Sequence, residues 1–71
     1  MDKLTKHQSF ALNNFPDEGW YRVDNAPSFW VWVRRKEYTA TILEGKGYLE
    51  SRVKPDKWKY SFELYREYRK V

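Results

Sequence analysis

The sequence of 71 residues contains no cysteine and a single histidine. Without cysteine, the chain has no disulfide and no thiolate-bound metal ion to support a small core. His7 has no other good metal ligand near it in the sequence, so we expect a surface residue rather than a catalyst or ligand. The composition therefore predicts a protein without a metal ion or another cofactor.

The chain also lacks a long apolar run, a glycine-rich phosphate loop and acidic residues at metal-binding spacing. No window approaches the roughly 18 apolar residues of a membrane span, and the amino end has no signal-peptide apolar region. The expected fold could bring Glu50 and Glu63 together, which is the minimum for a carboxylate-pair hydrolase, but a domain this small offers no pocket for them. We therefore expect a cytoplasmic, non-enzymatic protein that does not enter membranes.

Aromatic residues are abundant, since 14 of the 71 residues are Phe, Trp or Tyr. Each ring can bury a large apolar area, which compensates for the missing disulfides in a chain near the lower size limit for an independent core. Residues 1–71 are thus expected to form one domain.

Residues 29–35, Phe-Trp-Val-Trp-Val-Arg-Arg, give the strongest strand signal in the sequence. Strict alternation places the phenylalanine and both valines on one face, which we expect to be core. The opposite face carries two indoles and a guanidinium, from Trp30, Trp32 and Arg34. Such a face must be covered by another layer of the protein, by a partner or by stacked bases.

Three pairs of residues fit two-residue hairpin turns: Lys36-Glu37, Gly45-Lys46 and Pro55-Asp56. Together with a short strand over residues 20–23, they predict a mainly β fold, an antiparallel meander of about five strands over residues 20–65. Such a meander would curl into a half-open SH3-like or OB-like barrel. All three turns give the same core face. It comprises Phe29, Val31, Val33, Tyr38, Ala40, Ile42, Leu49, Val53, Trp58, Tyr60, Phe62 and Leu64.

The two ends of the chain are less regular. Residues 1–15 fit a short helix, with Asp2 or Thr5 as its cap, or an extended arm. Residues 57–65 alternate as a strand in register with the preceding one, although residues 57–70 also fit an amphipathic helix. The last residues, 66–71, are expected to be a frayed basic end or a short helical turn.

The same register gives the second sheet face a gradient from rings to cations. Residues 29–71 carry 11 Lys and Arg against 6 Asp and Glu, a net charge of +5. Rings that stack bases beside cations that contact phosphates are typical of single-strand nucleic-acid binding. We therefore predict a small DNA- or RNA-binding protein. The candidate site residues are Trp30, Trp32, Tyr48, Arg34, Arg52, Lys59, Arg35 and Lys36.

Three alternatives remain open. Residues 1–15 can cover Trp30 and Trp32 and turn that face into a second small core. The aromatic and basic face also suits a compact protein-binding inhibitor or accessory factor that acts on a larger, nucleic-acid-handling protein. Finally, an exposed edge strand, foremost residues 57–65, can pair with its copy in a homodimer.

Overall fold

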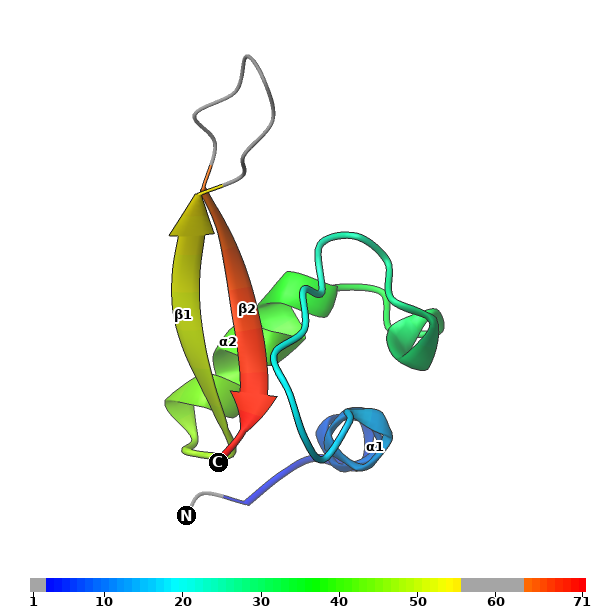
Figure 1. The fold of residues 1–71 in the computed structure, drawn as a ribbon. Coiled ribbons are helices and arrows are strands. Elements are labelled where there is room, and N and C mark those ends of the chain that lie inside the picture. The colour runs from blue at the N-terminus through cyan, green and yellow to red at the C-terminus, as the bar shows by residue number, and fades with distance from the viewer. Residues whose placement is uncertain (1–2, 56–63) are drawn as a thin grey trace.

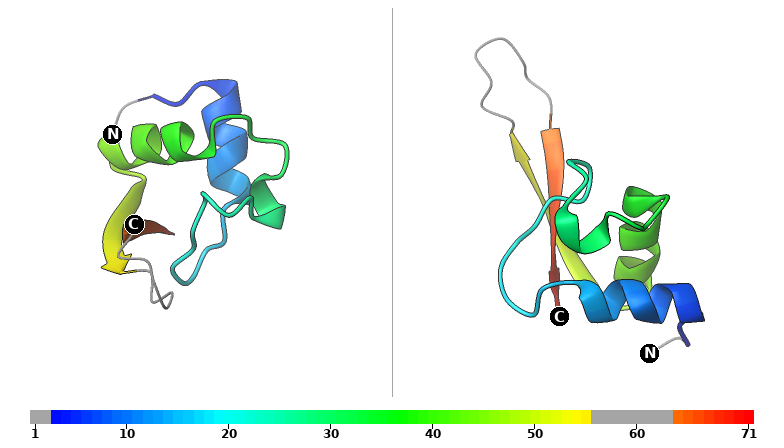
Figure 2. Two further views of the ribbon diagram at one scale, coloured as in Figure 1. Left: turned by 90° about the horizontal axis from the view of Figure 1, so that it is seen from above. Right: turned by 90° about the vertical axis from the view of Figure 1, so that its right-hand side faces the viewer.

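A computed structural model describes residues 3–55 and 64–71 of the chain. Its elements, in chain order, are helix α1 (Lys6–Asn14), the short 3-10 helix η1 (Ser28–Trp30), helix α2 (Lys36–Gly45), and strands β1 (Leu49–Pro55) and β2 (Leu64–Lys70). The strands form a hairpin that stands beside α2, and α1 lies near the base of the hairpin (Figure 1). The two helices cross one another on one side of the strands, as both further views show (Figure 2).

Helix α1 begins at a capping box formed by Thr5 and Gln8. The Thr5 hydroxyl accepts from the backbone N–H of Gln8 at 3.2 Å, and the Gln8 side chain accepts from the backbone N–H of Thr5 at 3.1 Å. These two bonds satisfy N–H groups that have no partner within the helix. Of the two alternatives for residues 1–15, the helix is therefore confirmed, with Thr5 as its cap.

The core is organised around Trp30, whose side chain is 0% exposed. Its indole Nε1–H donates to the backbone carbonyl of Ala11 in α1 at 2.8 Å. This bond satisfies the one polar atom of a large buried ring, and it ties η1 to the middle of α1. The remaining buried core residues are Ala11, Phe15, Val23, Val33, Ala40, Leu43, Leu49 and Tyr68.

A group of aromatic rings surrounds this indole in edge-to-face contacts. The Phe15 ring lies 5.5 Å from Trp30, 5.2 Å from Phe29 and 5.9 Å from Tyr21, measured between centroids. Such pairs add about 0.5 to 1.5 kcal/mol each beyond the area they bury. Aromatic side chains thus replace the disulfides that the chain lacks.

The predicted strand over residues 29–35 is wrong. Trp30 ends η1, and the backbone N–H of Val33 bonds to the Trp30 carbonyl at 2.9 Å, so the chain turns where alternation favoured extension. Val31, expected in the core, is 71% exposed, and Trp30, expected on the other face, is buried. The buried indole with its hydrogen bond outweighs the strand preference of the local sequence.

Residues 36–45 form helix α2 in place of a hairpin turn and a strand. Thr39, Ala40 and Leu43 are its buried residues, and their spacing is that of one helix face. Tyr38, assigned to the core by alternation, is exposed, and Ile42 is half-buried. The segment fits both periods, and packing against α1 and the hairpin selects the helix.

The predicted hairpin turn at Gly45-Lys46 is also wrong, because the chain passes there from a helix to a strand. Gly47 has a positive φ of 88°, which glycine adopts without strain. The backbone N–H of Tyr48 then bonds back to the Leu43 carbonyl at 2.9 Å. This closure of the helix end is a common use of glycine, and it directs the chain into β1.

Strands β1 and β2 pair antiparallel, with Leu49 opposite Lys70 and Pro55 opposite Leu64. The predicted register, with Val53 opposite Trp58, is therefore wrong, and so is the frayed end or helical turn over residues 66–71. Of the predicted strand 57–65, residues 57–63 lie outside the described residues. Of the residues expected in the core, Leu49 is buried, whereas Val53 in β1 and Leu64 in β2 are 50% and 68% exposed, so the expected division of faces is wrong at both.

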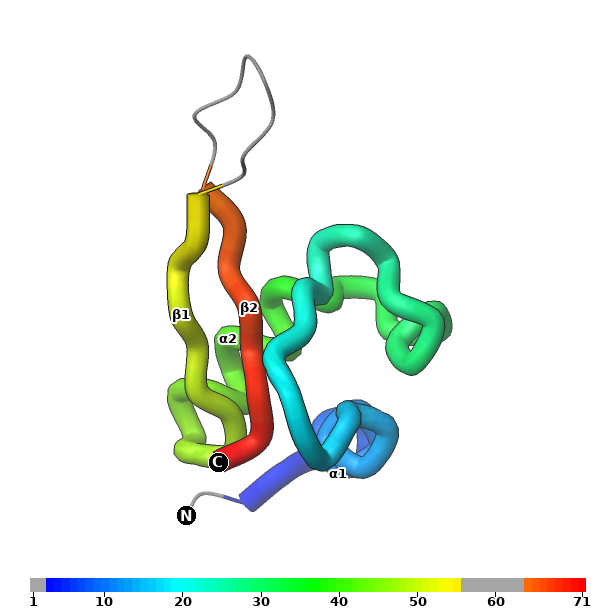
Figure 3. The backbone as a smooth tube through the Cα atoms, viewed as in Figure 1, coloured from blue at the N-terminus to red at the C-terminus, as the bar shows by residue number. Residues whose placement is uncertain are grey.

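Residues 20–23 contribute one isolated bridge instead of a strand. Tyr21 and Tyr68 exchange backbone hydrogen bonds of 2.9 and 2.8 Å, so this segment runs beside β2 (Figure 3). The described residues therefore contain a two-stranded sheet with two helices. The prediction of a mainly β meander, closed towards a barrel, is wrong.

The substitution Trp30→Phe should lower the free energy of unfolding by about 2 kcal/mol or more. It removes buried volume and leaves the Ala11 carbonyl without its donor. Urea unfolding followed by circular dichroism measures the loss. The matched control is Trp32→Phe, the same change at a 43% exposed indole, with an expected loss below about 0.5 kcal/mol. Equal losses of unfolding free energy in the two variants would contradict the placement of Trp30 in the core.

Candidate nucleic-acid interface

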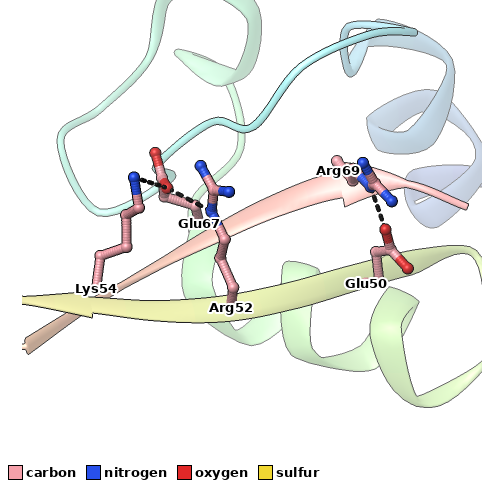
Figure 4. Close-up of polar contacts among 5 residues, drawn as sticks. All are labelled: Glu50, Arg52, Lys54, Glu67 and Arg69. Atoms are coloured by element: carbon pink, nitrogen blue, oxygen red, sulfur yellow. Dashed lines mark hydrogen bonds and ion pairs between the residues drawn. The ribbon is translucent and has the colours of Figure 1, made fainter.

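Two groups of described cations bear on the prediction of nucleic-acid binding, and the first lies on the outer face of the hairpin. Glu50 faces Arg69 across the strands, and Arg52 faces Glu67. Each pair forms a salt bridge, with 2.9 Å between Arg52 Nε and Glu67 Oε1, and the Lys54 ammonium lies 3.9 Å from the same Glu67 oxygen (Figure 4). We call Glu50, Arg52, Glu67 and Arg69 the charge ladder. Opposite charges placed directly across a sheet stabilise the pairing of its strands.

Aromatic rings cover part of the charge ladder. The guanidinium of Arg52 lies 4.3 Å from the centroid of the Trp20 ring, and that of Arg69 lies 4.8 Å from it. Arg22 lies 4.1 Å from the centroid of Tyr65 and forms a two-bond salt bridge with Asp24, at 2.8 and 2.7 Å. The cations of this face thus have carboxylate and ring partners within the chain.

The second group lies between η1 and α2, where Arg34 and Arg35 are exposed. Among the residues that the structure describes, no carboxylate lies within salt-bridge distance of either guanidinium. Trp32 precedes them and is 43% exposed, and Tyr38 follows in the first turn of α2 and is 60% exposed. We call Trp32, Arg34, Arg35 and Tyr38 the arginine patch.

A shallow groove of about 320 Å³ adjoins the arginine patch. Arg34, Arg35 and Tyr38 line one side of it, and the start of α1 lines the other through residues that include His7. The His7 ring meets Trp32 in an edge-to-face contact, with 5.6 Å between centroids, so the indole lies next to a residue that lines the groove. The groove therefore has rings and cations along its border.

The amino end of α2 adds to the positive potential of the patch. Arg35 is its N-cap and makes no side-chain capping bond, so the first backbone N–H groups of the helix have no such partner. These groups carry the positive end of the helix dipole. Glu37 in the first turn offsets part of this charge, while the Lys36 ammonium donates to the Val33 carbonyl at 2.8 Å and remains beside it.

The structure brings together four of the eight candidate residues from the sequence: Trp32, Arg34, Arg35 and Lys36. Trp30 is buried, as in the alternative where residues 1–15 cover it, and Tyr48 is half-buried against the core. Arg52 lies on the hairpin in the charge ladder, away from the patch. Lys59 lies outside the described residues. The predicted single sheet face, which was to carry six of the eight with Arg35 and Lys36 at the neighbouring strand ends, does not form.

Sequence reasoning missed one member of the patch, Tyr38, because alternation assigned it to the core. Its spacing of three residues from Arg35 is the signal that a helical interpretation would have used. The Arg35 guanidinium lies 5.9 Å from the centroid of the Tyr38 ring, which fits that spacing. His7 is exposed, as expected, although its contact with Trp32 was not foreseen.

Comparison with known proteins gives no match for this chain, either to a protein-family model, to a curated protein or to a solved structure. Within residues 3–55 and 64–71, no helix is both long and apolar enough to cross a membrane. In the same part of the chain, no three His, Asp or Glu side chains gather as metal ligands.

The Arg22 guanidinium holds the pKa of Asp24 below its ordinary value, chiefly through their hydrogen bonds. Because the pKa is lower in the folded state, the resulting stabilisation is present above the unfolded pKa of about 3.9 and disappears as the pH falls through the folded value. We expect the NMR titration midpoint of the Asp24 carboxyl to rise in Arg22→Gln. An unchanged midpoint would show that this salt bridge does not form in solution.

Proposed function

We propose that this protein is a small, non-enzymatic, cytoplasmic protein that binds single-stranded nucleic acid through the arginine patch. One observation carries the proposal. Two exposed rings, Trp32 and Tyr38, flank two exposed guanidiniums for which the described residues supply no carboxylate. A single strand offers the complementary chemistry, with bases for the rings and phosphates for the cations.

The charge ladder is a poorer candidate for the same role. Arg52 and Arg69 each have a carboxylate partner and both lie against Trp20. A phosphate at that face would have to compete with these contacts and would meet two nearby carboxylates. Arg34 and Arg35 lose no such partner when a phosphate arrives, which favours the arginine patch.

Binding would combine two contributions. A base stacked on Trp32 or Tyr38 contributes about 1 to 3 kcal/mol, and any base can stack because each has an aromatic face. Phosphates that meet Arg34 and Arg35 release counterions, which makes the affinity depend on salt. This chemistry predicts weak sequence preference and a preference for single strands, whose bases are free to leave the helical stack.

A protein partner is the second candidate, and the exposed apolar residues near the patch favour it. Val31 directly precedes Trp32 and is exposed, and Phe10 follows His7 by one turn of α1 and is also exposed. Trp, Phe and Arg are common anchors at protein interfaces, and such a surface would suit an inhibitor or accessory factor with an acidic partner.

The double variant Arg34→Ala/Arg35→Ala should weaken binding of a mixed-sequence single strand by about tenfold or more at low salt. It should also make the salt slope shallower by about 1.4, since each lost phosphate contact accounts for about 0.7. The matched control, Lys54→Ala/Arg66→Ala, removes the same charge from the hairpin. Fluorescence anisotropy of a labelled oligonucleotide measures both. Equal losses of affinity in the two double variants would show that only net charge matters, and would contradict binding at the arginine patch.

Replacing Trp32 tests the stacking contribution separately. Trp32→Leu should lose about 1 to 3 kcal/mol of binding free energy, and Trp32→Phe should lose less because it keeps a ring. Val31→Ala, at the neighbouring exposed position, is the control. If Trp32→Leu abolishes capture of a protein from lysate while oligonucleotide affinity is unchanged in every variant, the protein-binding candidate replaces this one.

A further inference from the structure

The outer edge of β1 has no strand partner among the described residues. Within residues 3–55 and 64–71 the sheet contains β1 and β2, and β2 has β1 on one side and the bridge from Tyr21 on the other. Strand β1 therefore lies at the border of the molecule, as its position in Figure 1 shows. Alternate backbone N–H and C=O groups of an edge strand point away from its partner, which makes the edge a template for another strand.

We propose that a second copy of this chain occupies that edge, with the two β1 strands antiparallel about a two-fold axis at Ser51. Facing residues in an antiparallel pair lie on the same face of the sheet, so in a pair of identical strands their numbers differ by an even number. One residue therefore lies midway between them, on the two-fold axis, and faces its own copy. The structure thus restricts the choice to a few registers, each named by its central residue. The pair would join two hairpins into one four-stranded sheet.

Charge selects among these registers. With Ser51 at the centre, Glu50 faces Arg52 of the second copy, and this contact occurs twice by symmetry. A centre at Glu50 or at Arg52 would place that charged residue opposite itself. A centre at Val53 would place Arg52 opposite Lys54. Only the Ser51 register pairs opposite charges without opposing like ones, and like charges directly opposite destabilise a sheet.

The charge ladder continues across the proposed interface. Within one chain, Glu50 pairs with Arg69 and Arg52 pairs with Glu67 (Figure 4). In the dimer, a row of four charged residues crosses the four strands, and symmetry makes two such rows. Each row runs Arg69, Glu50, Arg52 and Glu67, in which Arg52 and Glu67 belong to the second copy. The sign of the charge alternates along the row. The interface therefore adds an opposite charge beside Glu50 and beside Arg52, each of which already has a partner in its own chain.

The inner face of the hairpin supports the same register. Val53 is 50% exposed there, although it lies on the same face of β1 as the buried Leu49. In the Ser51 register, Val53 lies opposite Leu49 of the second copy, so its exposed side chain approaches an apolar position rather than a charged one. Pro55, which has no N–H to donate, lies outside the central pairs. Opposite charges on the outer face and apolar positions on the inner face thus agree on one occupant, a second copy.

Cysteine cross-linking tests the dimer and its register, because the natural chain has no thiol. In Ser51→Cys, the two thiols of a dimer face each other across the axis at a separation that a disulfide spans. We expect a covalent dimer after mild oxidation, seen on a non-reducing gel. The matched control Val53→Cys lies on the same face two residues along. Its two thiols are too far apart in the dimer, so it should form no covalent dimer and run as a single chain on the gel. Equal cross-linking of both variants, or of neither, overturns the proposal.

A charge variant tests the same interface without a cross-link. Arg52→Glu places two carboxylates opposite each other at both symmetric contacts, and should raise the dimer dissociation constant by about tenfold or more. The control Lys54→Glu makes the same charge change at a residue that faces Tyr48 of the second copy. It should change the dimer dissociation constant much less. Light scattering over a concentration series, without nucleic acid, measures the dissociation constants of both variants, and circular dichroism verifies that each variant folds. A natural chain that keeps the mass of one copy at every concentration contradicts the dimer and leaves the proposed binding function untouched.

Discussion

The buried indole of Trp30 is the constraint on which the rest of this structure depends. Its Nε1–H reaches the carbonyl of Ala11, nineteen residues earlier, and the rings of Phe15 and Phe29 lie against it. In a chain without disulfides, this contact joins α1 to the segment that leads into α2. A large ring that is fully buried and fully hydrogen-bonded stabilises one arrangement of those elements over its competitors.

The position of Trp30 also determines what is exposed. Because the chain turns directly after this residue, Val31 and Trp32 lie on the surface, and Arg34 and Arg35 follow before α2 begins. A strand over the same residues would have exposed Trp30 together with Trp32. The arginine patch is therefore a consequence of core packing, and its rings and cations come from one short segment whose ends are held by η1 and α2.

Part of this structure could be predicted from local signals in the sequence, although those at the amino end left a helix and an arm as alternatives. The cap at Thr5, the helix that follows it and the buried position of Leu49 in β1 depend on short-range patterns, and all are confirmed. The strand prediction for residues 36–45 was wrong because this segment fits two periods. Its β-branched and aromatic side chains alternate as in a strand, while Thr39, Ala40 and Leu43 also lie on one face of a helix. Short apolar segments fit both periods, and only tertiary contacts decide between them.

The residues of the candidate site also fall into those that local sequence predicted and those that it did not. Trp32, Arg34 and Arg35 are adjacent in sequence, so any fold that exposes this segment keeps them together. Arg52 was placed beside them only by the predicted strand register, and it lies instead in the charge ladder with Glu67. Tyr38 joins the patch only because residues 36–45 form a helix. Such long-range placement depends on contacts like that of Trp30 with Ala11, which no local pattern encodes.

The most direct test of this account is a proton–nitrogen NMR spectrum of the indole N–H groups, recorded first during hydrogen exchange and then with added single-stranded oligonucleotide. The account predicts that the Trp30 signal exchanges slowly, because its N–H is buried and bonded, and that it shifts little on addition. The Trp32 signal should exchange quickly and shift most. A Trp30 signal that exchanges as fast as that of Trp32 would contradict the account. So would an oligonucleotide that perturbs Trp20, beside the charge ladder, instead of Trp32.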